Sequence, residues 1–220
     1  ASGLRGKQAR IDEQQGGNRR LLHNLMPQSL AERYQRGETA IAEHHDNVSV
    51  VSVALKSNDE YARNLTDAEE VERLNVLMRG FDEAAQKAGI EKVRTLRGGY
   101  LASSGLSVPR VDNVRRAVDF AQQMQAVVER FRDQNHATIG LRVGVDTGTV
   151  TSGLVARTNL AYDLWGDAVN LAYRARTVSV EPGIYVSQSV RDRLQDTVTF
   201  SDAGTVELRG AKQNVWKVGP

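Results

Sequence analysis

The order of the expected elements places this chain of 220 residues in the α+β class, with a ferredoxin-like (split βαβ) arrangement. Three observations predict it. A β-rich run without a breaker occupies 48–55, apolar residues recur at helical spacing over 65–89 and 114–131, and two short strands flank a glycine pair between 91 and 104. The order β-α-β-β-α-β, with additions, predicts an antiparallel sheet with covering helices.

The first half of the chain supplies the first strand, the first helix and the hairpin that follows. Val-Ser-Val-Val-Ser-Val-Ala-Leu at 48–55 is expected to be a central strand buried on both faces. Thr66 and Glu69 resemble a capping box at the start of the first long helix, and Gly89 is expected to end it.

The second half continues with the second long helix and a further strand pair. Residues 139–154 are predicted to form a strand, a turn at Asp146-Thr147-Gly148 and a second strand. The remaining expected elements are a helix at 167–178, a short helix after Ser187, and terminal strands at 206–208 and 215–218.

Residues 1–40 are predicted to be a linker and a signalling helix, and residues 41–220 to be the folded domain. Apolar residues at 21, 22, 25 and 26 have helical spacing before Pro27, and the pattern resumes at Leu30 and ends at Gly37. This helix either packs on its own domain or forms the end of a signalling coiled coil, and the heptads are too few to decide.

Composition excludes several classes of function. The formal net charge is only +2 and no long Lys or Arg run is present, so nucleic acid is not an expected partner. Without cysteine, disulfides and thiolate metal sites are excluded, and a cytoplasmic location is expected. No apolar run of about 18 residues occurs. Because the chain opens without methionine, we expect a membrane anchor only in segments upstream, as in the cytoplasmic domain of a membrane-anchored receptor.

Two segments contain the most informative polar positions. They are Leu-Arg-Val-Gly-Val-Asp-Thr-Gly-Thr-Val at 141–150 and Tyr-Asp-Leu-Trp-Gly-Asp-Ala-Val-Asn-Leu-Ala-Tyr-Arg-Ala at 162–175. Asn170 and Arg174 are four residues apart on the expected helix, so they share one face and can reach a common ligand.

On these motifs, residues 21–218 resemble the catalytic domain of the class III adenylate and guanylate cyclases. The resemblance implies the class III nucleotide cyclase fold for 41–220. It also implies catalytic roles for Asn170, which would orient the ribose, and Arg174, which would stabilise charge on the phosphates during attack by the 3′-hydroxyl group. A planar, always-charged guanidinium suits that role.

The resemblance further implies residues that bind the nucleotide. Arg94 and Asp163 match the pair that selects the purine. Adenylate cyclases typically have lysine with aspartate or threonine there, so Asp163 agrees, Arg94 departs, and ATP is expected over GTP. Arg209 and Lys212 lie near the position of a lysine that contacts phosphate in the family.

The family's two metal-binding aspartates are both missing. The alignment puts Ala54 at the first position and Gly98 at the second, and neither has an oxygen ligand for a hard cation. No cofactor is therefore expected in this chain alone, and Mg²⁺ or Mn²⁺ is expected only with a partner that binds metal. Arg97, beside the second position, is a candidate source of fixed positive charge.

Retained catalytic positions and missing metal ligands resemble the partner half of two-domain adenylate cyclases. We therefore expect a signalling domain that forms a homodimer or a heterodimer with another cyclase domain and is inactive as the homodimer. Two alternatives are a weakly active adenylate or guanylate cyclase, and a purely structural dimerisation module of a receptor.

Overall fold

The computed structural model describes residues 6–10, 28–38, 42–57, 64–96, 98–156 and 160–220. These residues form two compact units. The smaller unit comprises 1–43 with 152–163, and the larger comprises 44–151 with 164–220.

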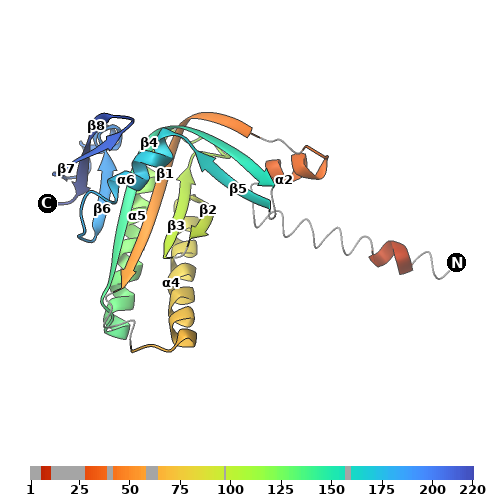
Figure 1. Ribbon diagram of the computed structural model, residues 1–220, viewed down its shortest axis with the longest axis horizontal. Coiled ribbons are helices and arrows are strands. Elements are labelled where there is room, and N and C mark those ends of the chain that lie inside the picture. Colours follow the sequence, from red (N-terminus) through yellow and green to blue (C-terminus); the bar gives the residue numbers. More distant parts are fainter. Residues whose placement is uncertain (1–5, 11–27, 39–41, 58–63, 97, 157–159) are drawn as a thin grey trace. The chain divides into compact units, whose positions relative to one another are not determined.

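In the described part of the chain, seven strands pair in the order β2-β3-β1-β4-β6-β8-β7 (Figure 1). The bounds are β1 (Ala42–Ser57), β2 (Glu91–Leu96), β3 (Gly99–Ser104), β4 (Ile139–Ala156), β6 (Gly183–Ser187), β7 (Phe200–Leu208) and β8 (Ala211–Val218). The order of the first four strands is that of a ferredoxin-like sheet, so the predicted fold class is confirmed.

Most of the pairs whose direction is defined are antiparallel. They are β1 with β3, β2 with β3, β6 with β8 and β7 with β8, whereas β4 and β6 are parallel. Parallel neighbours need a crossover connection, and helix α6 (Asp167–Ala175) lies in the segment between these two strands.

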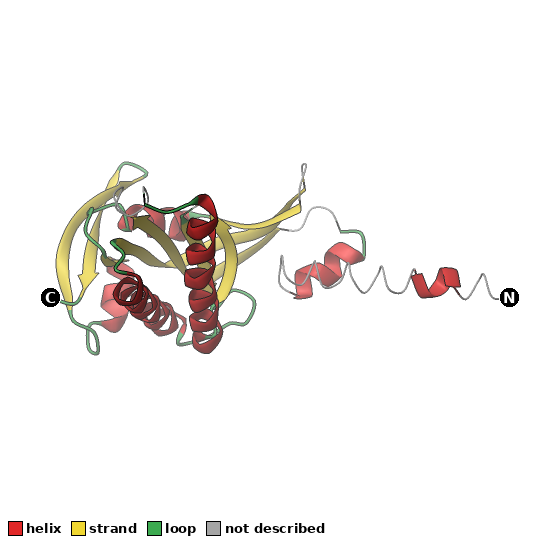
Figure 2. Cartoon of the chain, turned by 90° about the horizontal axis from the view of Figure 1, so that it is seen from below, coloured by secondary structure: helices red, strands yellow, loops and turns green. Residues whose placement is uncertain are grey.

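Two long helices, α4 (Asp67–Ala88) and α5 (Asn113–Asn135), pack side by side over one face of the sheet (Figure 2). The short helix α7 (Gln188–Leu194) adds Val190 and Leu194 to the same core. The largest buried members of this core include Phe81, Tyr100, Phe120, Met124, Val143 and Ile184.

The predicted ends of the first long helix are confirmed. The Thr66 hydroxyl accepts a hydrogen bond from the Glu69 backbone N–H at 3.2 Å. Gly89 ends the helix in the left-handed region, at φ 67°, where glycine has no steric penalty.

The predicted turn at 146–148 is wrong. Strand β4 continues through it to Ala156, and the strand that pairs with its far end is β5 (Leu160–Trp165), which the sequence analysis did not expect. Asp146 and Thr147 are only 5% and 6% exposed. A buried Ser187 hydroxyl donates a hydrogen bond to Asp146 at 2.6 Å, so a residue type typical of turns is accommodated inside the sheet.

The smaller unit contains helix α2 (Gln28–Gln35), which confirms the helical pattern after the proline. Gly37 follows at φ 94°, and its N–H donates to the Tyr34 carbonyl at 3.0 Å. Arg33 forms ion pairs with Glu38 and Glu43. The predicted helix at 21–26 and Pro27 lie outside the described residues, and the coiled coil stays a prediction.

Candidate functional site

Two glycines allow helix α6 to pack directly against the backbone of strand β4. A Cβ atom added at Gly144 would lie 1.8 Å from the Ala172 carbonyl oxygen, and one at Gly166 would lie 3.0 Å from the Thr149 carbonyl oxygen. Gly166 also has φ 125°, which an L side chain rarely adopts. The strand therefore accepts the helix backbone only because these positions lack side chains.

The same packing leaves the predicted catalytic residues on the surface. Ala168, Leu171, Ala172 and Ala175 are buried, whereas Asn170 and Arg174 are exposed. They are one helical turn apart on the solvent side, as the spacing predicted. Both side chains are thus presented on a helix of fixed position and are accessible to a ligand.

An ion pair brings Arg209 to the start of α6. Its guanidinium lies 2.9 Å from the Asp167 carboxylate, and Asp167 is the first residue of the helix. Arg209 and Gly210 form the loop between β7 and β8 and both have positive φ, 51° and 77°, which is typical of a two-residue hairpin turn. Lys212 is exposed on β8, opposite Glu207.

The two positions that match the family's metal ligands lie next to each other. Ala54 on β1 pairs with Gly99, and the Leu55 N–H donates to the Gly98 carbonyl at 2.8 Å. The backbone therefore brings the two positions together, but Ala54 and Gly98 lack carboxylate side chains. Among the described residues, no group of three or more His, Asp or Glu side chains could hold a metal ion. At the two described positions, Ala54 and Gly98 have no side-chain oxygen that could bind a metal ion. Arg97 lies outside the described residues.

The residues predicted to select the purine belong to different units. Arg94 is exposed on β2, at a bulge in its pairing with β3. Asp163 is half-buried on β5, in the smaller unit. Their joint contact with a base stays a prediction.

Asp146 is a buried titratable group that sequence reasoning missed. Burial raises the pKa of its carboxyl to about 6, and nearby Asp167 adds to the shift, while the hydrogen bond from Ser187 opposes it. The available signal was its position after Val143-Gly144-Val145, where the alternation continues a buried strand.

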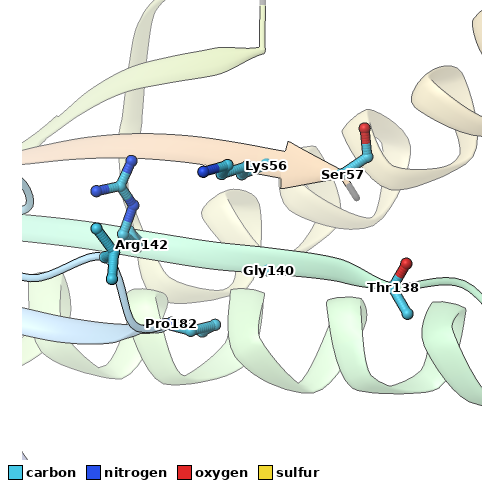
Figure 3. A pocket seen from close by; sticks show the side chains of 7 residues that line it. Lys56, Ser57, Thr138, Gly140, Arg142 and Pro182 are labelled. Atoms are coloured by element: carbon cyan, nitrogen blue, oxygen red, sulfur yellow. The ribbon is translucent and has the colours of Figure 1, made fainter. Parts of the chain in front are cut away.

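Two basic residues near Ala54 were also missed. Lys56 follows Ala54 by two residues on β1, and Arg142 lies on the neighbouring strand β4. Both line a cavity of about 410 Å³ (Figure 3). The signal was a lysine that follows the β-rich run 48–55, and an arginine between Leu141 and Val143.

The sheet order and the exposed Asn170 and Arg174 on α6 agree with the resemblance to the nucleotide cyclases. The family model described as "Adenylate and Guanylate cyclase catalytic domain" matches residues 40–218. The chain belongs to this family.

Similar sequences and structures agree with that assignment. An adenylate cyclase of Mycobacterium tuberculosis is 34% identical over 191 residues, which cover 86% of this chain and 43% of that protein. Human atrial natriuretic peptide receptor 2 is 31% identical over 208 residues, covering 90% of this chain and 20% of the receptor. The chain thus spans less than half the length of these curated relatives.

One similar solved structure is the catalytic core of a rhodopsin-guanylyl cyclase with converted specificity, in complex with ATPalphaS. It superposes with a TM-score of 0.74 at 26% identity, and the match covers 80% of this chain and 97% of that chain. The guanylate cyclase domain of RhGC from Catenaria anguillulae, in complex with GTP, superposes with a TM-score of 0.73 at 25% identity. The match covers 80% of this chain and 98% of that chain.

Proposed function

We propose that this domain is the partner half of a two-chain nucleotide cyclase. It contributes Asn170 and Arg174 to an active site whose metal ions are held by another cyclase domain, and it is silent as a homodimer. One observation supports this above all: helix α6 is anchored with both polar side chains exposed, whereas the adjoining positions Ala54 and Gly98 offer no oxygen ligand.

The proposed chemistry follows from the side chains. A guanidinium at Arg174 is a fixed, always-charged donor fork, which suits stabilisation of negative charge that grows on phosphates in the transition state. The Asn170 amide both donates and accepts hydrogen bonds, which suits a ribose hydroxyl. Mg²⁺ or Mn²⁺ from the partner chain would activate the attacking hydroxyl and neutralise the triphosphate.

The substrate class is a purine nucleoside triphosphate, and we propose ATP over GTP because Asp163 agrees with the adenylate cyclase pattern. The name of the mycobacterial relative supports that preference. Arg94, Arg209 and Lys212 are proposed as further nucleotide contacts. The name of the receptor relative supports a signalling role, and we propose a location on the cytoplasmic side of a membrane. No helix in the described part of this chain is long and apolar enough to cross one.

The test is complementation. A homologous cyclase domain that has both metal aspartates, but whose own Asn and Arg are replaced, is mixed with this chain and assayed for cyclic nucleotide. Turnover should appear only in the mixture. Arg174→Ala should lower it roughly a hundredfold or more, corresponding to about 2–4 kcal/mol in barrier.

The matched control is Arg79→Ala, which removes an exposed arginine on α4. It should leave the restored activity unchanged. If the mixture forms dimers by sedimentation and stays silent, or if Arg174→Ala has no effect, the partner-half proposal fails.

A weakly active cyclase is the second candidate, and one observation favours it. Asp67 and Glu70 line a cavity of about 500 Å³ together with Gly98, so two carboxylates lie near the second position that matches a metal ligand. Cyclic nucleotide made with Mn²⁺ by the purified chain, and abolished by Asp67→Asn with Glu70→Gln, would favour this candidate over the first.

A further inference from the structure

Arg176, the residue that follows α6, connects this helix to strand β1. Its Nε donates a hydrogen bond of 3.0 Å to the Ser52 hydroxyl group. Val51 and Val53 belong to the core that α4 and α5 cover, so the alternation of the strand places Ser52 on the opposite face of the sheet. The contact therefore joins two segments that are 124 positions apart in the sequence.

The same guanidinium contacts an aromatic ring on α6. The Arg176 Cζ atom lies 4.5 Å from the centroid of the Tyr173 ring, which is within the range of a cation–π contact. Tyr173 is 54% exposed, three residues after Asn170 and directly before Arg174. One half-buried guanidinium thus links the strand to the exposed face of α6 that carries both predicted catalytic residues.

Backbone hydrogen bonds fix the last turn of α6 around this residue. The Arg176 N–H donates to the Ala172 carbonyl at 3.4 Å. The Thr177 N–H and hydroxyl group both donate to the Arg174 carbonyl, at 3.0 and 2.6 Å. The Arg176 carbonyl accepts a hydrogen bond of 3.4 Å from Arg142 Nη1 on β4. The end of the helix that carries Arg174 is therefore tied to β4 as well as to β1.

The positive charge of Arg176 has an electrostatic cost. Burial lowers the pKa of its guanidinium, Tyr173 opposes the shift, and the charge of Arg142 adds to it. An apolar side chain of similar length would avoid this cost. Stability alone therefore does not explain an arginine at this position.

We propose that Arg176 is a positioning residue, which fixes the end of α6 against β1 and thereby determines how Arg174 is presented to the nucleotide. The inference rests on the proposed function. A guanidinium suits this role because its planar face can stack on a ring while its Nε–H donates within the plane, whereas a lysine ammonium is a point charge. If Arg174 acts on charge that develops in the transition state, its misplacement should lower kcat and leave KM nearly unchanged.

Hydrogen exchange followed by NMR tests the placement of α6 in this chain alone. The Thr177 and Val178 amides close the last turn, and in Arg176→Met they should exchange about tenfold faster than in wild type. Arg176→Lys should show a smaller increase, and Tyr173→Phe, which keeps the ring, should match wild type. The matched control is Arg132→Met, which removes an exposed arginine in the last turn of α5 and should leave these amides unchanged.

Complementation tests the consequence for the reaction, with the same cyclase domain that has both metal aspartates. Arg176→Met should lower the restored kcat about tenfold and leave KM for ATP within about twofold. Ser52→Ala should act in the same direction, and Ser52→Thr, which keeps a hydroxyl acceptor, should recover most of the loss. Arg132→Met should behave as wild type. A residue that only stabilised the fold would not change kcat well below the melting temperature.

Unchanged amide exchange in Arg176→Met would overturn the proposal. Faster exchange with an unchanged kcat would also overturn it, since Arg176 would then be a structural contact only. A wild-type mixture that stays silent would reject the partner-half function. The exchange rates would then decide separately whether Arg176 fixes the end of α6 that carries Arg174.

Discussion

Helix α6 and the paired ends of β1 and β3 are the two regions in which the resemblance to the family implies residues for one reaction, and they differ in this chain. At α6 the helix packs closely on the backbone of β4, and the polar side chains of Asn170 and Arg174 are present and exposed. At β1 and β3 the hydrogen bond between Leu55 and Gly98 keeps the geometry, but the ligands are absent. The difference teaches that backbone geometry and side-chain chemistry are separate features, so the fold alone is not evidence for catalysis.

Gly144→Ala should break the α6 region and have the largest effect. The new methyl group would lie 1.8 Å from the Ala172 carbonyl, where neither backbone can yield without a shift of the helix. We expect a loss of about 3 kcal/mol in the free energy of unfolding, measured by urea denaturation.

The matched control is Gly148→Ala on the same strand, where the nearest atom, Ala168 Cβ, is 3.9 Å away. It should change stability by less than about 1 kcal/mol. Equal losses in the two variants would mean that α6 does not sit on β4 as described.

Asp146→Asn tests the electrostatics of the same region. The pKa of Asp146 is about 6 in the folded protein and near 3.8 in the unfolded chain, so between these values the folded state binds more protons. Stability from the neutral carboxyl is present below pH 4 and is lost as pH rises through 6. The stability difference between Asp146→Asn and wild type should therefore grow by roughly 2–3 kcal/mol from pH 4 to pH 7.5.

Urea denaturation at the two pH values measures this difference. Asp133→Asn, which removes an exposed carboxylate on α5, controls for the loss of one negative charge. A stability difference for Asp146→Asn that is independent of pH would contradict a raised pKa.

Ala54→Asp combined with Gly98→Asp tests the paired ends of β1 and β3. If only the ligands are missing, the double variant should gain at least about tenfold in nucleotide affinity with Mn²⁺, or roughly 1.4 kcal/mol. Gly98 has φ 66°, which aspartate tolerates at a modest cost, and its Cβ would meet only the Leu55 carbonyl at 3.6 Å.

Gly98→Ala alone measures that backbone cost by thermal melting. A folded double variant with no Mn²⁺-dependent gain would indicate that more than the two ligands has changed at this edge.

Arg209 should give the smallest effect. Its ion pair with Asp167 is exposed, so Arg209→Ala should cost less than about 1 kcal/mol. Arg209→Gly also loses the pair but suits φ 51°, and should be more stable than the alanine variant by about 1 kcal/mol. Equal loss of nucleotide affinity in both variants would support a phosphate contact, and unchanged affinity would leave Arg209 a turn residue.

Local signals predicted much of this fold because they act within a few residues. The capping box at Thr66, the glycine end at Gly89 and the periodicity of α4 and α5 depend on backbone geometry and one apolar face. At Asp146 the turn-type residues 146–148 outweighed the strand pattern before them, and the partner that satisfies the carboxyl, Ser187, is distant in sequence.

The candidate site divides in the same way. Asn170 and Arg174 were proposed from the resemblance to the family, and their spacing correctly predicted one shared face of the helix, which is exposed. Lys56 and Arg142 lie on strands separated by two helices and a hairpin, so only the pairing of β1 with β4 brings them to one cavity.

Glycine at 144 leaves no side chain between helix α6 and the strand beneath it. A helix that rests on side chains can slide by rotamer changes, whereas one that rests on backbone moves only together with its strand. A force applied at Arg174 by a ligand or a partner is therefore transmitted to β4, which pairs with β1, β5 and β6. Helix α6 and the central strand β4 are therefore expected to move as one body, and Ala54 lies on the neighbouring strand β1.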